Sequence, residues 1–96
     1  MNAQTLIDNR KNEILRLAAL HGARSIQVFG STVSGQPELA NDIDFLVDLA
    51  EYRSLLDQVA LQQDLEQLLG TPVDVVLVGG ISPHLEHRIM TEAVPL

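Results

Sequence analysis

The sequence predicts an α/β (α+β) domain in which a small sheet of three or four strands packs against helices. Three observations support this class. Stretches with helical spacing of apolar residues alternate with short runs rich in valine, isoleucine and phenylalanine. Glycine or proline stands at most of the boundaries between them. The chain of 96 residues is long enough for only one core, so we expect residues 1–96 to form a single domain.

The composition narrows the classes of partner. Hydrophobic residues make up 46% and charged residues 20%, a mixture typical of a globular protein. Thirteen acidic residues against six basic ones give a formal charge of −7, so no direct contact with nucleic acid is expected, because that would need a basic surface. A small phosphate ligand that binds together with a divalent cation, or a basic protein partner, is compatible with this charge. The absence of cysteine excludes disulfides, thiolate zinc sites and cysteine nucleophiles.

The sequence gives no sign of a membrane partner. No apolar run reaches the length of a membrane-spanning helix, and the polar N-terminus does not resemble a signal peptide. We therefore expect a cytoplasmic protein. Because the domain is small and rich in aliphatic residues, we also expect it to act within an oligomer.

The first predicted element is a helix over residues 3–20, followed by a strand over residues 25–29. Apolar residues of the helix fall on one stripe, and Gly22 stands where a helix normally ends. His21, in the last helical turn, is interpreted as a favourable partner of the helix dipole rather than a ligand.

A glycine–serine pair follows the first strand. Gly30 ends the strand, and Gly30 with Ser31 opens a turn. Glycine lets a ligand approach the backbone closely, and Ser31 could offer its hydroxyl and its amide to a phosphate at a helix start. The pair alone is equally compatible with a plain turn.

The second predicted strand, residues 42–49, carries two aspartates one residue apart. Because side chains alternate along a strand, Asp42 and Asp44 point the same way, with their α-carbons about 7 Å apart. Both carboxylates could converge on a hard cation. The alternative is a solvated strand face. Two like charges on one face of a strand are unfavourable unless a cation lies between them, which keeps the metal interpretation open.

A second helix is predicted from Ser54, a good N-cap, to Leu69, with Gly70 at its C-terminal end. We expect six residues to form its broad apolar face: Leu55, Leu56, Val59, Leu65, Leu68 and Leu69.

The third predicted strand, residues 73–78, is apolar apart from Asp74, a pattern typical of a strand buried on both faces. A lone carboxylate there is unfavourable unless it is paired or binds a ligand. The alternative is an aspartate near solvent at the start of the strand. A last helix, residues 83–93, carries His84 and His87, which we interpret as surface residues because no third metal ligand of the usual kind is nearby.

Together these motifs point to a family. Gly30-Ser31, ten intervening residues, then Asp42-Ile43-Asp44 with a later Asp74, resembles the minimal nucleotidyltransferase family of the polymerase-β-like superfamily over essentially the whole chain. The resemblance implies the mixed sheet of that fold. It implies that Gly30 and Ser31 bind the β- and γ-phosphates of a nucleoside triphosphate, ATP. It also implies that Asp42, Asp44 and Asp74 are the catalytic residues and the ligands of two Mg²⁺ ions.

Proteins of this family are typically antitoxins paired with a HEPN-domain toxin, a ribonuclease. The resemblance therefore implies a Mg-dependent protein adenylyltransferase that moves AMP from ATP onto a tyrosine of the toxin within a hetero-oligomer. The chain departs from the family pattern at Ser34, where arginine is usual, and at Asn41, where serine is usual. The missing arginine removes a charge partner of the triphosphate. Two alternatives stay open: neutralisation of the toxin by binding alone, and a nucleotide sensor without transfer.

Overall fold

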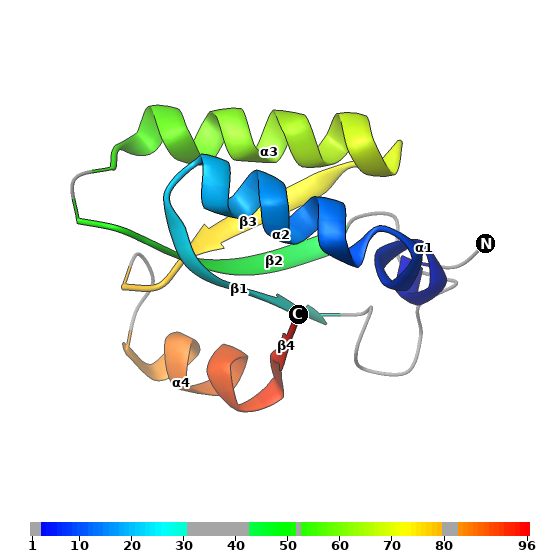
Figure 1. The fold of residues 1–96 in the computed structure, drawn as a ribbon. Helices are drawn as coiled ribbons and strands as arrows, with labels where there is room; N and C mark the ends of the chain where they lie inside the picture. Colours follow the sequence, from blue (N-terminus) through cyan, green and yellow to red (C-terminus); the bar gives the residue numbers. More distant parts are fainter. Residues whose placement is uncertain (1–2, 31–42, 52, 80–82) are drawn as a thin grey trace.

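The computed structural model of the protein describes residues 3–30, 43–51, 53–79 and 83–96. The elements follow the predicted order, except that the first helix is divided into α1 and α2 and a two-residue strand follows the last helix (Figure 1). In chain order the elements are α1 (Ala3–Asn9), α2 (Lys11–Leu20), β1 (Ala23–Phe29), β2 (Ile43–Leu49), α3 (Leu55–Leu69), β3 (Val73–Leu77), α4 (Pro83–Glu92) and β4 (Val94–Pro95).

The four described strands form one mixed sheet in the order β3-β2-β1-β4, which confirms the predicted fold class. β1 pairs antiparallel with β2 and with the two-residue β4, whereas β2 and β3 are parallel. β2 is therefore an inner strand, and β3 lies at one edge of the sheet.

Alternation along the strands gives the sheet two different faces. α2 and α3 lie over one face, and α4 lies on the opposite side (Figure 1). Apolar residues of the strands on the first face meet apolar residues of the helices, and the resulting cluster is aliphatic apart from one phenylalanine. Its members are Ile7, Ile14, Ala18, Ile26, Val28, Ile43, Phe45, Val47, Leu61, Leu65, Leu69, Val73 and Val75.

The predicted N-terminal helix is wrong in one respect, because it is broken at Arg10. The dihedral angles of Arg10 (φ −116°, ψ 14°) leave the helical region, and its N–H donates to the carbonyl of Ile7 at 3.1 Å. The apolar spacing gave no sign of this break, because Ile7 and Ile14 are both fully buried on either side of it.

α3 begins and ends as predicted, but half of its predicted apolar face is wrong. Leu61, Leu65 and Leu69 are buried and form a row with a spacing of four residues, whereas Leu55, Leu56 and Val59 are exposed. Continuing the buried row back by one turn reaches Asp57 rather than a leucine. The sheet therefore covers a narrower stripe of α3 than the sequence suggested.

β3 is buried on one face only, which corrects the prediction of a strand buried on both faces. Val73 and Val75 are buried, whereas Asp74 between them is exposed. The strand lies at the edge of the sheet, and Asp74 points away from the helical layer, so the solvent alternative for this aspartate holds.

One of the three histidines contacts an aspartate on another helix, and the other two are exposed. His21 Nε2 lies 2.6 Å from Asp64 Oδ2 and joins the end of α2 to α3. His84 and His87 are exposed on α4, as expected. Among the helices of the described residues, none is long and apolar enough to cross a membrane.

The start of α3 is held by a reciprocal cap. Ser54 Oγ accepts from the N–H of Leu56, and Asp57 Oδ2 accepts from the N–H of Ser54 at 3.0 Å. Arg53 Nη1 donates to the other oxygen of Asp57 at 3.1 Å. The hydrogen bond from Ser54, followed by the interaction with Arg53, lowers the pKa of Asp57 below its ordinary value.

This lowered pKa predicts how the stability of the cap depends on pH. A carboxylate with a lowered pKa in the folded protein stabilises it fully above the unfolded pKa, and the contribution is lost as the pH falls through the folded pKa. Asp57→Asn should therefore lower the Tm at pH 7, and its difference from the wild type should shrink as the pH falls from about 5 to 2. Glu51→Gln, at an exposed carboxylate, is the control. A Tm difference for Asp57→Asn that stays constant over this range would contradict the prediction.

Candidate active site

The register of three strands brings the predicted site residues that the structure describes to one end of the sheet. β1 and β2 are antiparallel, and Phe29, the residue before Gly30, pairs with Asp44. β2 and β3 are parallel, and Asp44 pairs with Asp74. Gly30, Asp44 and Asp74 therefore lie where β1 ends and where β2 and β3 begin (Figure 1).

Asp44 and Asp74 share a face of the sheet. Their neighbours along each strand are buried toward α2 and α3, so the two carboxylates point to the opposite face. Asp44 is half-buried and Asp74 is exposed. Residues paired on neighbouring strands have α-carbons about 5 Å apart, so both carboxylates can reach one cation.

The charges of this pair favour a cation. Like charges placed directly opposite one another on neighbouring strands repel and destabilise a sheet. A divalent cation that both carboxylates bind would remove this repulsion. Carboxylate oxygens are the ligands that Mg²⁺ prefers, whereas zinc sites use mainly histidine and cysteine. The donor set of Asp44 and Asp74 therefore fits Mg²⁺.

Gly30 belongs to the site because the space that a side chain would fill is used by a neighbouring residue. Its φ of +80° lies in the left-handed region, which side chains other than glycine rarely adopt. A β-carbon at this position would also overlap Asp44 Oδ2. The sequence suggested that glycine leaves room for a ligand here. The structure adds that the space over Gly30 is already occupied by the carboxylate of Asp44.

Ser31 and Asp42 lie outside the described residues, as do Ser34 and Asn41, so their predicted roles stay predictions. Within the part of the chain that the structure describes, no group of three or more histidine, cysteine, aspartate or glutamate side chains is placed to hold a metal ion. Asp44 and Asp74 supply two of the three predicted carboxylates.

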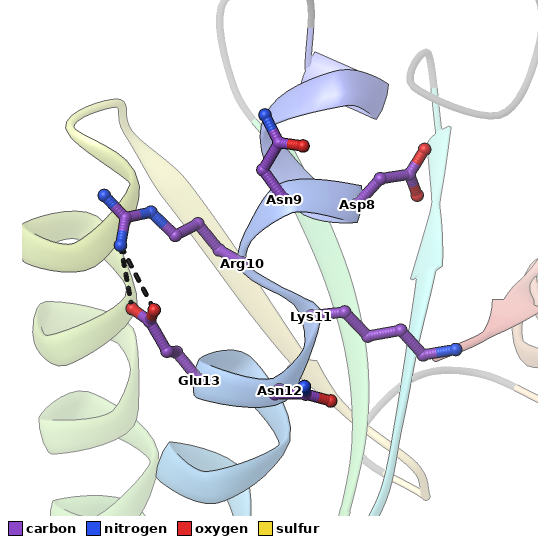
Figure 2. Close-up of a pocket in the computed structure, with 6 residues that line it drawn as sticks. All are labelled: Asp8, Asn9, Arg10, Lys11, Asn12 and Glu13. Atoms are coloured by element: carbon purple, nitrogen blue, oxygen red, sulfur yellow. Dashed lines mark hydrogen bonds and ion pairs between the residues drawn. The ribbon is translucent and has the colours of Figure 1, made fainter.

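A polar pocket that the sequence did not indicate lies at the break between α1 and α2. It has a volume of about 290 Å³. Arg10 Nη1 binds both carboxylate oxygens of Glu13 at 3.1 Å, and Lys11 points away from that pair (Figure 2). The pocket is a surface depression at the helix break, because consecutive residues line it rather than distant elements. The lining residues are Asp8, Asn9, Arg10, Lys11, Asn12 and Glu13.

The contact between Gly30 and Asp44 predicts an unequal effect of two alanine substitutions. Gly79 also has a positive φ, of +85°, but among the described residues other than its chain neighbours no atom lies within 4 Å of a β-carbon built there. Gly79→Ala should lower the free energy of unfolding by about 1–2 kcal/mol, the penalty of a left-handed backbone alone. Gly30→Ala should lower it further, because it must also displace the carboxylate of Asp44. Urea unfolding of both variants measures this difference, and equal losses would contradict the contact.

Comparison with known proteins gives a consistent picture. Residues 10–96 match the family described as polymerase beta, nucleotidyltransferase. The chain is 40% identical over 73 residues to protein adenylyltransferase MntA of Thermococcus cleftensis, which covers 76% of this chain and 74% of that protein. It is also 40% identical over 88 residues to a Methanocaldococcus jannaschii protein assigned as a protein adenylyltransferase, over 92% of this chain and 95% of that one.

Solved structures share the fold. One assigned as a minimal nucleotidyltransferase has a TM-score of 0.87 and 42% identity, and the match covers 100% of this chain and 97% of that chain. A chain from a toxin–antitoxin complex with AMP-PNP has a TM-score of 0.74 and 27% identity, and covers 88% of this chain and 69% of that chain. A chain from an MntA toxin–antitoxin complex has a TM-score of 0.71 and 26% identity, and the match covers 90% of this chain and 69% of that chain.

Proposed function

This chain belongs to the polymerase β nucleotidyltransferase family, and from that premise we propose that it is a protein adenylyltransferase acting as the antitoxin of a toxin–antitoxin pair. The observation that carries the proposal is the register that pairs Asp44 with Asp74 beside Gly30. Relatives named protein adenylyltransferase support the reaction, and the related toxin–antitoxin complexes support the partner.

The proposed reaction transfers AMP from ATP to a tyrosine of a HEPN-domain ribonuclease toxin. The phenolic oxygen attacks the α-phosphorus of ATP and forms a new ester bond. The bond from that phosphorus to the oxygen shared with the β-phosphate breaks, and pyrophosphate leaves with its electron pair. The phenolic proton passes to a carboxylate or to water. The modified tyrosine silences the toxin.

Exposure separates the roles of the two described carboxylates. Asp74 is exposed on the edge strand, so a hydroxyl on another protein can reach it, and we assign it to the attacking oxygen. Asp44 is half-buried against the Gly30 turn, which restricts its orientation, and we assign it to metal binding together with Asp42. These carboxylates would hold Mg²⁺, which would supply charge neutralisation at the triphosphate and activation of the nucleophile.

The turn after β1 is proposed to bind the phosphates. The side-chain space of Gly30 is filled by the carboxylate of Asp44, so we assign phosphate binding to the backbone of Gly30 and to the amide and hydroxyl of Ser31, which are suitable donors for phosphate oxygens. Serine at position 34 does not supply the positive charge of the arginine usual in this family. That departure and the net charge of −7 favour a second candidate function, neutralisation of a basic toxin by binding alone.

Intact mass measurement after incubation with Mg²⁺, ATP and the HEPN partner distinguishes these functions. The partner should gain one or more AMP units. Asp44→Ala should reduce the transfer rate at least about 100-fold, since it removes a ligand that acts at the developing charge. Asp48→Ala is the matched control, because Asp48 lies on the same strand and pairs with Arg24 at 3.1 Å. Transfer by Asp44→Ala at the wild-type rate would contradict the proposed site, and a complex without any transfer would favour the second function.

A further inference from the structure

The first turn of α3 carries apolar side chains that are exposed rather than packed in the core. Leu55, Leu56 and Val59 have exposed fractions of 70%, 80% and 50%. Residues three and four apart lie side by side on a helix, so these three, called the α3 patch below, form one continuous surface. Contiguous exposed apolar residues often mark interaction sites, whereas single ones are common on any surface.

A groove continues the α3 patch toward the edge of the sheet. It lies between α3 and β3 and has a volume of about 310 Å³. Leu55 lines this groove and also belongs to the patch, so a partner could contact both at once. The lining residues are Leu55, Gln58, Val75, Val76 and Leu77.

The edge of β3 beside the groove is partly closed to an added strand. Gln58 Nε2 donates to the carbonyl of Val75 at 2.9 Å, and Glu66 Oε2 accepts from the N–H of Val73 at 3.0 Å. A partner that extended the sheet would need these outward groups of β3 for its own ladder. The groove is therefore suited to apolar side chains from a helix rather than to a new strand.

The net charge of the chain favours a basic partner for the α3 patch over a second copy of this chain. α3 contains three acidic residues, Asp57, Asp64 and Glu66, of which Asp57 pairs with Arg53 at 3.1 Å and Asp64 lies 2.6 Å from His21. Two copies that met through this surface would each bring the same acidic helix and a net charge of −7. Such like charges oppose association, whereas a basic surface is attracted.

The α3 patch lies far from the candidate active site. α3 begins near the end of the sheet where β2 and β3 finish, whereas Asp44 and Asp74 lie where these strands begin (Figure 1). The five steps of strand from Asp44 to Leu49 span about 17 Å. A protein docked on the patch would leave the carboxylates open to a hydroxyl on another part of the same partner.

We propose that the α3 patch and its groove are the docking surface for the basic toxin partner, which inserts apolar side chains of a helix there. The inference rests on the proposed function for the identity of the partner. Docking and AMP transfer then use opposite ends of the sheet, so binding can be removed without touching the carboxylates.

The test is the double variant Leu55→Ser/Leu56→Ser, measured with the purified HEPN partner. The Kd of the complex should rise at least about tenfold for each leucine that acts as a binding hot spot. The KM for the partner in AMP transfer should rise similarly, with kcat within about twofold of wild type. Thermal unfolding should be unchanged, because both side chains are exposed in the isolated chain. Leu20→Ser, at a leucine that is 66% exposed on α2, is the control.

The outcomes separate the two proposals. A wild-type complex that forms without AMP transfer contradicts the proposed function, and the Kd of the double variant still tests the docking surface. An unchanged Kd in the double variant, or an equal rise in Leu20→Ser, overturns the docking proposal alone. A wild-type chain that is dimeric by light scattering and a double variant that is monomeric would assign the patch to a second copy and also overturn it.

Discussion

The register of β1, β2 and β3 determines both the apolar core and the position of the candidate site residues. Pairing of Phe29 with Asp44 and of Asp44 with Asp74 places Gly30 and two carboxylates at one end of the sheet. The same register turns Phe45 and Val75 toward the helices. A slip of one residue in β2 would turn Asp44 toward the helical layer of α2 and α3 and turn Phe45 away from it, so the same register is needed for the core and for the placement of the charges.

Local patterns in the sequence predicted most of the fold, and tertiary surroundings decided the rest. Alternation and capping residues indicated β2, β3 and the ends of α3, because these depend on neighbours a few positions away. The break at Arg10 and the exposure of Leu55 were not predictable, because apolar spacing does not say how much of a helix the sheet covers. The run of valines in β3 predicted a strand buried on both faces. The run does not indicate whether the strand lies at the edge of the sheet.

Some features of the candidate site could likewise be predicted from the sequence, and others required the structure. The sequence indicated that Gly30, Asp44 and Asp74 belong together, and the strand pairing accounts for how residues so far apart become neighbours. The contact between Gly30 and the carboxylate of Asp44 needed the structure, since it arises from pairing across strands. Chemistry at one end of the sheet and an apolar surface at the other suit a protein that must hold a macromolecular substrate while modifying it. This separation also accommodates neutralisation by binding alone, for which only the α3 patch would be needed.

We propose that Gly30 and the two aspartates form the nucleotide and metal site. The most direct measurement is a crystal structure with Mn²⁺ and a non-hydrolysable ATP analogue, with the metal located by its anomalous scattering. The site described above predicts a metal peak bonded to carboxylate oxygens of both Asp44 and Asp74, with the triphosphate against the turn at Gly30. A nucleotide or metal bound elsewhere, for example in the depression beside Lys11, with both aspartates free of metal, would contradict it.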